Sequence, residues 1–156
     1  MRIYRNKAAQ RILATGAAAV IMTATMGSPA MAVDDSFAVS TTNGCGVVNF
    51  IDYGPGWPGD GNNDDYLVIH DYCADGYGVK VWIWLTRRTT AGSLTFSWER
   101  YNGNGLAGEA VLADPWQDQG DVVTNDRIGL KVCLVDGFSD PNPKSCDSRN
   151  HTSSDG

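Results

Sequence analysis

The sequence predicts an all-β protein, either an antiparallel β-sandwich or a small barrel of six to seven strands. Short apolar runs alternate with stretches rich in Gly, Asn and Asp, and no segment keeps a helical apolar period over roughly eleven residues. Of the 18 acidic residues 16 are Asp, which favours turns over helix interiors. Four cysteines follow an export signal, as in small domains stabilised by disulfides.

The pattern of residues 1–32 predicts a secretory signal peptide, which we expect to be removed. The basic start MRIYRNKAAQR precedes an apolar, Ala-rich run and the segment SPAMA, whose small residues Ala30 and Ala32 set cleavage after Ala32. The apolar run is shorter than the ~20 residues of a membrane-spanning helix, and no Cys marks a lipid-anchored cleavage point. We therefore expect a secreted, extracellular protein that leaves the membrane after cleavage.

The remaining chain, 33–156, has the size of one domain. We expect an N-terminal arm at 33–44, the β-sandwich domain at 45–146 and a disordered polar tail at 147–156. Without the signal peptide, the chain has eight basic and 18 acidic residues and therefore a net charge of about −10. Such a surface repels nucleic acid and anionic membranes. We expect a monomer whose partner is an extracellular polysaccharide or protein.

The expected strands, in chain order, are 45–53, 66–73, 79–88, 93–101, the weak 109–113, and 127–137, separated by turns such as NGNG at 102–105. The strongest is VKVWIWLTRR at 79–88. Its odd positions form an aliphatic face that must point inward, and its even positions carry Lys80, Trp82, Trp84 and Thr86. In 127–134 the even positions are the aliphatic ones, which leaves Arg127, Gly129, Lys131 and Cys133 outward.

The stretch GPGWPGDGNNDDY, 54–66, reads as the tip of a hairpin. Centring that tip near residue 59 places Ile51 opposite Leu67, Asn49 opposite Ile69, and Cys45 opposite Cys73. Opposed residues lie within disulfide range, so we predict a Cys45–Cys73 bridge. Cys133–Cys146 then follows by elimination. Zinc is the alternative, but no C-x-x-C or Cys/His spacing supports it.

The same stretch offers a calcium alternative. Asp60, Asn62 and Asp64 have the 1, 3, 5 spacing of a calcium loop, with Asp71 at position 12. The match fails at position six, where Asp65 replaces the required Gly, and no helices flank the loop. We therefore expect no cofactor, with Ca²⁺ as the alternative. A second, weaker acidic cluster comprises Asp114, Asp118 and Asp121.

Four tryptophans are candidate ligand-binding residues: Trp57, Trp82, Trp84 and Trp116. Exposed aromatic side chains typically mark a binding surface, and sugar rings are a suitable ligand class for a secreted protein. The competing interpretation, which we favour, buries Trp82, Trp84 and Trp98 in the core and packs Trp57 and Trp116 against the domain. Exposure of Trp82 and Trp84 decides between the two.

No catalytic constellation is evident, and we expect no enzyme activity. His70 and Asp71 are neighbours on a strand, so their side chains point to opposite faces and do not form a dyad. His151 lies in the polar tail, and the two glutamates, Glu99 and Glu109, are ten residues apart. The disulfides leave no thiol nucleophile, and the common hydrolase, zincin and phosphate-loop motifs are absent.

A protease inhibitor is a further alternative. The Pro-containing segment 136–145 lies between Cys133 and Cys146 and would form a rigid loop, with Phe138 or Lys144 as specificity residue. Rigid loops of this kind lower the entropic cost of binding. The competing interpretation is a closed C-terminal loop without a target.

Two blocks carry a resemblance: HDYCADGYGVKVWIW at 70–84, with its D-x-x-A-D-G-x-G-V core, and RIGLKVCLVDG, which a later Cys follows. In these the chain resembles a group of small secreted, disulfide-bonded β proteins of filamentous soil bacteria. The resemblance implies export, a small β fold and a C-terminal disulfide, and it assigns no site residues. Together the observations predict a secreted, non-enzymatic binding or interaction module, with a sugar- or calcium-binding module and a protease inhibitor as alternatives.

Overall fold

A computed structural model describes residues 34–53 and 65–154. The predicted signal peptide, Trp57 and the candidate ligands Asp60, Asn62 and Asp64 lie outside the described residues. Within these ranges the chain is all-β, as predicted, with eight strands rather than six to seven. The strands are β1 (Phe37–Ser40), β2 (Gly46–Asp52), β3 (Asp65–Asp71), β4 (Gly78–Thr89), β5 (Gly92–Asn102), β6 (Val111–Ala113), β7 (Arg127–Val135) and β8 (Lys144–Thr152).

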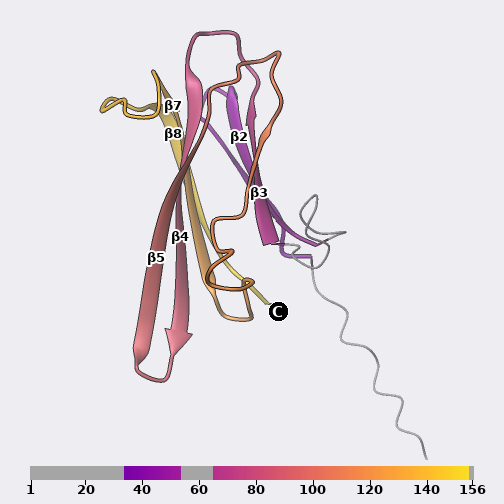
Figure 1. The fold of residues 1–156 in the computed structure, drawn as a ribbon, viewed down its shortest axis with the longest axis vertical. Coiled ribbons are helices and arrows are strands. Elements are labelled where there is room, and N and C mark those ends of the chain that lie inside the picture. Colours follow the sequence, from indigo (N-terminus) through magenta and orange to yellow (C-terminus); the bar gives the residue numbers. More distant parts are fainter. Residues whose placement is uncertain (1–33, 54–64, 155–156) are drawn as a thin grey trace, which may run out of the picture. The chain divides into compact units, whose positions relative to one another are not determined.

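The strands form two antiparallel four-stranded sheets, in the orders β1-β2-β3-β6 and β5-β4-β7-β8. Figure 1 shows β4 and β5 as a long hairpin in the second sheet, beside β7 and β8. The two sheets share one buried apolar cluster, so their arrangement is sandwich-like rather than a single closed barrel. Among the described residues no helix is long and apolar enough to cross a membrane.

Alternate residues of each strand build this core. From the second sheet, β4 and β7 contribute the two aliphatic faces that the sequence predicted to point inward: Val79, Val81, Ile83, Leu85, Ile128, Leu130, Val132 and Leu134. The first sheet contributes Phe37, Val39, Val48, Phe50, Leu67 and Ile69. Burial of these side chains is the main stabilising contribution, and it fixes which face of every strand is the outer one.

The predicted register of the β2–β3 hairpin is wrong by one residue. Phe50, not Ile51, lies opposite Leu67, and Val48 lies opposite Ile69. Residues that face each other across a sheet point to the same side, so a buried Leu67 requires a buried partner. Phe50 is fully buried and Ile51 is not, which selects the observed register.

Both predicted disulfides are confirmed, Cys45–Cys73 and Cys133–Cys146. The first forms despite the shifted register because Tyr72, whose backbone N–H donates a hydrogen bond to the Cys45 carbonyl, is followed directly by Cys73, outside both strands. Its Cα atoms are 5.1 Å apart, within the range that a disulfide spans. The second joins the neighbouring strands β7 and β8.

The prediction of a disordered tail from residue 147 is wrong, since β8 extends to Thr152 and the backbone of Ser153 exchanges two hydrogen bonds with the turn before β7. Most side chains of β8 are exposed. An edge strand of this kind is held by backbone hydrogen bonds to its neighbour and needs no apolar alternation. The N-terminal arm also contains a strand, β1, which pairs with β2.

The segment between β6 and β7, residues 114–126, is anchored to the core by Trp116. This side chain is fully buried, and its Nε1 donates a hydrogen bond of 2.8 Å to the carbonyl of Asp65. Its ring contacts Phe50 and Trp98 edge-on. The proposal that Trp116 binds a ligand is therefore wrong, and packing of the loop against the domain accounts for this residue.

Arg87 and Asp126 fix the other end of that segment. The Arg87 guanidinium lies 2.8 Å from the buried carboxylate of Asp126 and donates hydrogen bonds to the carbonyls of Gln119 and Asp121. Because both charged groups are hydrogen-bonded, the buried carboxylate is compensated. The segment thus binds to β4 through polar contacts and to the core through Trp116.

We predict that Trp116→Ala lowers the free energy of unfolding by about 3–5 kcal/mol, because it removes a fully buried indole and leaves a cavity. Chemical denaturation followed by circular dichroism measures this change. The matched control is Trp84→Ala, in the exposed face of β4, which should cost less than about 1 kcal/mol. Equal losses in the two variants would show that Trp116 does not anchor the segment.

Candidate binding face

The outer face of the sheet β5-β4-β7-β8 carries the tryptophans of β4. Because the odd residues of β4 enter the core, Lys80, Trp82 and Trp84 point away from it. Trp84 is 37% exposed and Trp82 is half-buried, whereas Trp98 packs against the core from β5. The favoured expectation that all three are core residues is wrong for Trp84, since no described element covers this face there.

Residues of four strands lie in register across this outer face. The row at Trp84 consists of Ser97, Trp84, Gly129 and Asn150, one residue from each strand. The adjacent row consists of Thr95, Thr86, Arg127 and Thr152. Hydroxyl, amide and guanidinium groups therefore surround one exposed indole, and the hydroxyls of Thr86 and Thr95 lie 3.0 Å apart.

Two hollows on this face share Thr86, Arg127 and Asn150 and form a continuous groove. Their volumes are about 450 and 280 Å³. The larger is lined by Thr86, Arg88, Ser93, Asn125, Arg127, Asn150 and Thr152, and the smaller by Trp84, Thr86, Thr95, Arg127, Gly129 and Asn150. The lining consists of hydroxyl, amide and guanidinium groups around one indole, so the groove is a polar site with a single aromatic wall.

Gly129 forms the floor of the groove beside Trp84. A Cβ atom at this position would lie 2.9 Å from Asn150 Oδ1 and 3.3 Å from Trp84 Cε3. Both side chains therefore converge over the glycine backbone, and any larger residue would occupy their space. The outward position of Gly129 follows from the sequence. That Gly129 forms the floor of the groove could be recognised only once Asn150 was placed beside it on β8.

Trp82 is less accessible than Trp84 because two lysines cover it. Lys80 Nζ lies 4.8 Å and Lys131 Nζ 5.1 Å from its ring centre, as cation–π contacts. Lys80 is further held by an ion pair with Glu99 at 2.8 Å and donates a hydrogen bond to the carbonyl of Phe138. Of these two candidates, Trp84 is the one whose ring is available in the groove.

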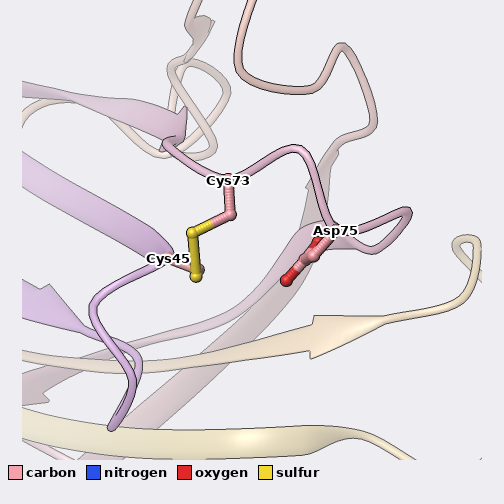
Figure 2. A group of neighbouring side chains, drawn as sticks. All are labelled: Cys45, Cys73 and Asp75. Carbon is pink, nitrogen blue, oxygen red and sulfur yellow. A yellow bond between two sulfur atoms is a disulfide. The ribbon is translucent and has the colours of Figure 1, made fainter.

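Among the described residues, one group brings three potential metal ligands together: Cys45, Cys73 and Asp75 (Figure 2). The two sulfur atoms form a disulfide and are therefore not thiolate ligands. A single exposed carboxylate remains, which is too few donors for a metal centre. The weaker acidic cluster of Asp114, Asp118 and Asp121 does not form a group of this kind.

The described part of the candidate calcium loop also fails. Asp65 and Asp71, at its sixth and twelfth positions, lie at opposite ends of β3. Six residue steps of extended strand separate them by about 20 Å, so this part of the chain does not fold back as a calcium loop does. Asp65 is moreover buried, and its Oδ2 accepts a hydrogen bond from the backbone N–H of Val122.

His151, Asp35 and Ser154 lie together where the ends of the described chain meet. His151 Nε2 is 3.3 Å from Asp35 Oδ1, and the Ser154 hydroxyl donates to Asp35 Oδ2. Burial acts to raise the pKa of Asp35, but the hydrogen bonds from Ser154 and the proximity of His151 lower it overall. The carboxylate lies between the serine and the histidine, so histidine does not activate the serine as in a catalytic triad.

The segment between β7 and β8 engages the two residues proposed as inhibitor specificity residues. The Phe138 ring lies 4.3 Å from Lys80 Nζ and contacts Tyr101 edge-on. Lys144 donates a hydrogen bond of 2.6 Å to the Tyr77 hydroxyl, which raises the pKa of its ammonium group. Both side chains thus contact their own domain, while the Phe138 ring remains 47% exposed.

Comparison with protein-family models, curated proteins and solved structures finds no match to this chain. The resemblance to small secreted proteins of filamentous soil bacteria accordingly stays a prediction. The assignment of a site depends on the geometry of the groove, whose polar residues Arg88, Thr95 and Asn150 the sequence did not single out.

Asp71 is a buried acid beside the first disulfide. Its Oδ1 accepts a hydrogen bond from the N–H of Cys73, while its Oδ2 has no partner among the described residues. Burial raises the pKa of this carboxyl above its ordinary value of 3.8, and Asp75 contributes to the rise. The folded state thus binds this proton more tightly than the unfolded chain does.

We predict that Asp71 stabilises the fold below pH 3.8 and that this contribution is lost as pH rises through the raised pKa. Asp71→Asn keeps an acceptor for Cys73 and removes the ionisation. The stability of the variant relative to wild type should therefore increase as pH rises above 3.8 and through the raised pKa of Asp71. Urea unfolding across this range measures it, and a difference that does not vary with pH would contradict the assignment.

Proposed function

We propose that this protein is a secreted, non-enzymatic binding module that holds a saccharide in the groove on the outer face of the sheet β5-β4-β7-β8. The observation that carries the proposal is the exposed indole of Trp84 in a groove lined by hydroxyl and amide groups. The C–H groups of a sugar ring pack against an aromatic face, while its hydroxyls need donors and acceptors at the edge. Trp84 provides the first, and Thr86, Thr95 and Asn150 provide the second.

The scaffold suits a site of this kind. The groove residues lie on β-strands whose other face is in the core, which limits their movement and lowers the entropic cost of binding. Two disulfides support an extracellular location. On this proposal the two sheets pack as a β-sandwich that serves as a rigid support for one binding face.

The calcium and inhibitor alternatives have less support. The calcium alternative depends on Asp60, Asn62 and Asp64, which lie outside the described residues, and the segment that follows them is the extended strand β3. The inhibitor alternative requires a free side chain at Phe138 or Lys144; both contact neighbouring residues of the domain, and the Phe138 ring is 47% exposed. A groove with an exposed aromatic wall favours the saccharide module over both.

We predict that at least one member of a panel of xylo-, cello-, chito- and galacturono-oligosaccharides binds the mature protein. Trp84→Ala should weaken that binding about tenfold or more, because the stacking surface is lost. Gly129→Ala should also weaken it, since the added methyl group narrows the floor. Isothermal titration calorimetry provides the affinities.

The matched control is Leu112→Ala, which removes a similarly exposed apolar side chain from the other sheet. This variant should bind like wild type. Absence of binding across the panel, or unchanged affinity in Trp84→Ala, would overturn the proposed function.

A further inference from the structure

We infer that the groove is specific for a saccharide carrying an anionic group, a carboxylate or a sulfate, which Arg88 and Arg127 bind beside Trp84. This inference rests on the proposed function and extends it from saccharides in general to acidic ones. Arg88 and Arg127 line the same hollow, from β4 and β7 respectively.

The groove has the opposite charge to the molecule as a whole. The complete chain has a net charge of −6, yet the residues that line the two hollows include two arginines and not one carboxylate. Exposed charges are screened over about 8 Å at physiological salt. An anion in the groove therefore interacts mainly with these two guanidinium groups and less with the distant acidic surface.

Within the described part of the chain, the guanidinium groups of Arg88 and Arg127 make no ion pair with a carboxylate and no side-chain hydrogen bond. Other basic groups near this face are engaged: Lys80 with Glu99, Lys131 over Trp82, and Arg87, on the inner side, with Asp126. Two like charges that share a hollow repel each other, and a bound anion relieves that repulsion. Arginine in addition presents a planar fork that matches a carboxylate or sulfate.

The remaining lining favours a sugar as the carrier of the anion over an acidic peptide. Hydroxyls of Thr86, Ser93 and Thr152 and amides of Asn125 and Asn150 surround the arginines, and Trp84 adjoins them through the shared groove. A ligand with many hydroxyl groups around one charge uses all of these partners. An acidic peptide could also pair its backbone with these groups, but the exposed indole of Trp84 next to the hydroxyls and amides suits the alternating C–H and hydroxyl faces of a sugar ring better.

Two pairs of probes, each with one anionic and one neutral member on the same sugar backbone, test this inference: oligogalacturonate against its methyl ester, and dextran sulfate against dextran. We expect one anionic member to bind about tenfold or more tightly than its neutral counterpart. Its affinity should fall as salt is raised. The pair that shows the difference identifies carboxylate or sulfate as the preferred group.

Arg127→Gln and Arg88→Gln should each weaken binding of the anionic probe about tenfold and leave the neutral one unchanged. Both residues are exposed, so the variants should fold. Arg100→Gln is the control, because it makes the same change in charge on β5, outside the groove. If Arg100→Gln weakened binding of the anionic probe as much as Arg127→Gln does, the effect would be one of net charge alone, and the inference would be overturned.

The outcomes separate the two proposals. Equal binding of anionic and neutral probes would overturn the anionic specificity and leave the saccharide module in place. Binding of neither kind of probe would overturn both. Binding of a poly-glutamate peptide as tightly as the acidic saccharide would also overturn the inference, by showing that charge alone is recognised.

Discussion

The burial of one face of β4 is the constraint on which the rest of the structure depends. Its four odd-numbered aliphatic residues are fully buried between the sheets. A β-strand alternates its side chains between two faces, so this burial forces the even-numbered residues outward. The outer face is therefore a consequence of core formation, and the indole of Trp84 is held there by the same interactions that stabilise the fold.

A second set of contacts couples the core to the groove. Arg87 faces inward between two outward residues of the groove, Thr86 and Arg88. Its ion pair with Asp126 fixes the turn in which Asn125 adopts a φ of 71° and lines the larger hollow. Anchoring of the segment 114–126 thus also positions groove residues. The stability of that segment and the shape of the binding face are linked through one partly buried ion pair.

Much of the fold could be predicted from alternation and composition. The inward faces of β4 and β7 follow from their apolar period, and both disulfides were predicted correctly because a register error of one residue still leaves Cys45 and Cys73 close together. The register of β2 and β3 could not be predicted from the tip alone, because it depends on the parity of buried residues such as Phe50 and Leu67. β8 was missed because its sequence, KSCDSRNHT, has no apolar face and pairs through its backbone.

The candidate site was predictable only in part. Trp84 was identified as a candidate from sequence, but its exposure depended on whether another element covers the sheet. The remaining groove residues come from four strands, and one of these, β8, carries no sequence signal. Convergence of Trp84, Gly129 and Asn150 in one row is a property of sheet order, which local patterns do not determine. The interpretation of Trp116 failed for a related reason, since a polar loop sequence does not reveal contact with a distant core.

Mapping of backbone amide shifts by nuclear magnetic resonance during titration with the tightest-binding saccharide tests the central claim most directly. We expect the largest changes at Trp84, Thr86, Arg127, Gly129 and Asn150, together with a shift of the Trp84 indole N–H. The amide of Leu112, on the other sheet, and the indole of Trp116, in the core, should change little. Changes concentrated on the sheet β1-β2-β3-β6 or on the segment between β7 and β8 would contradict the account.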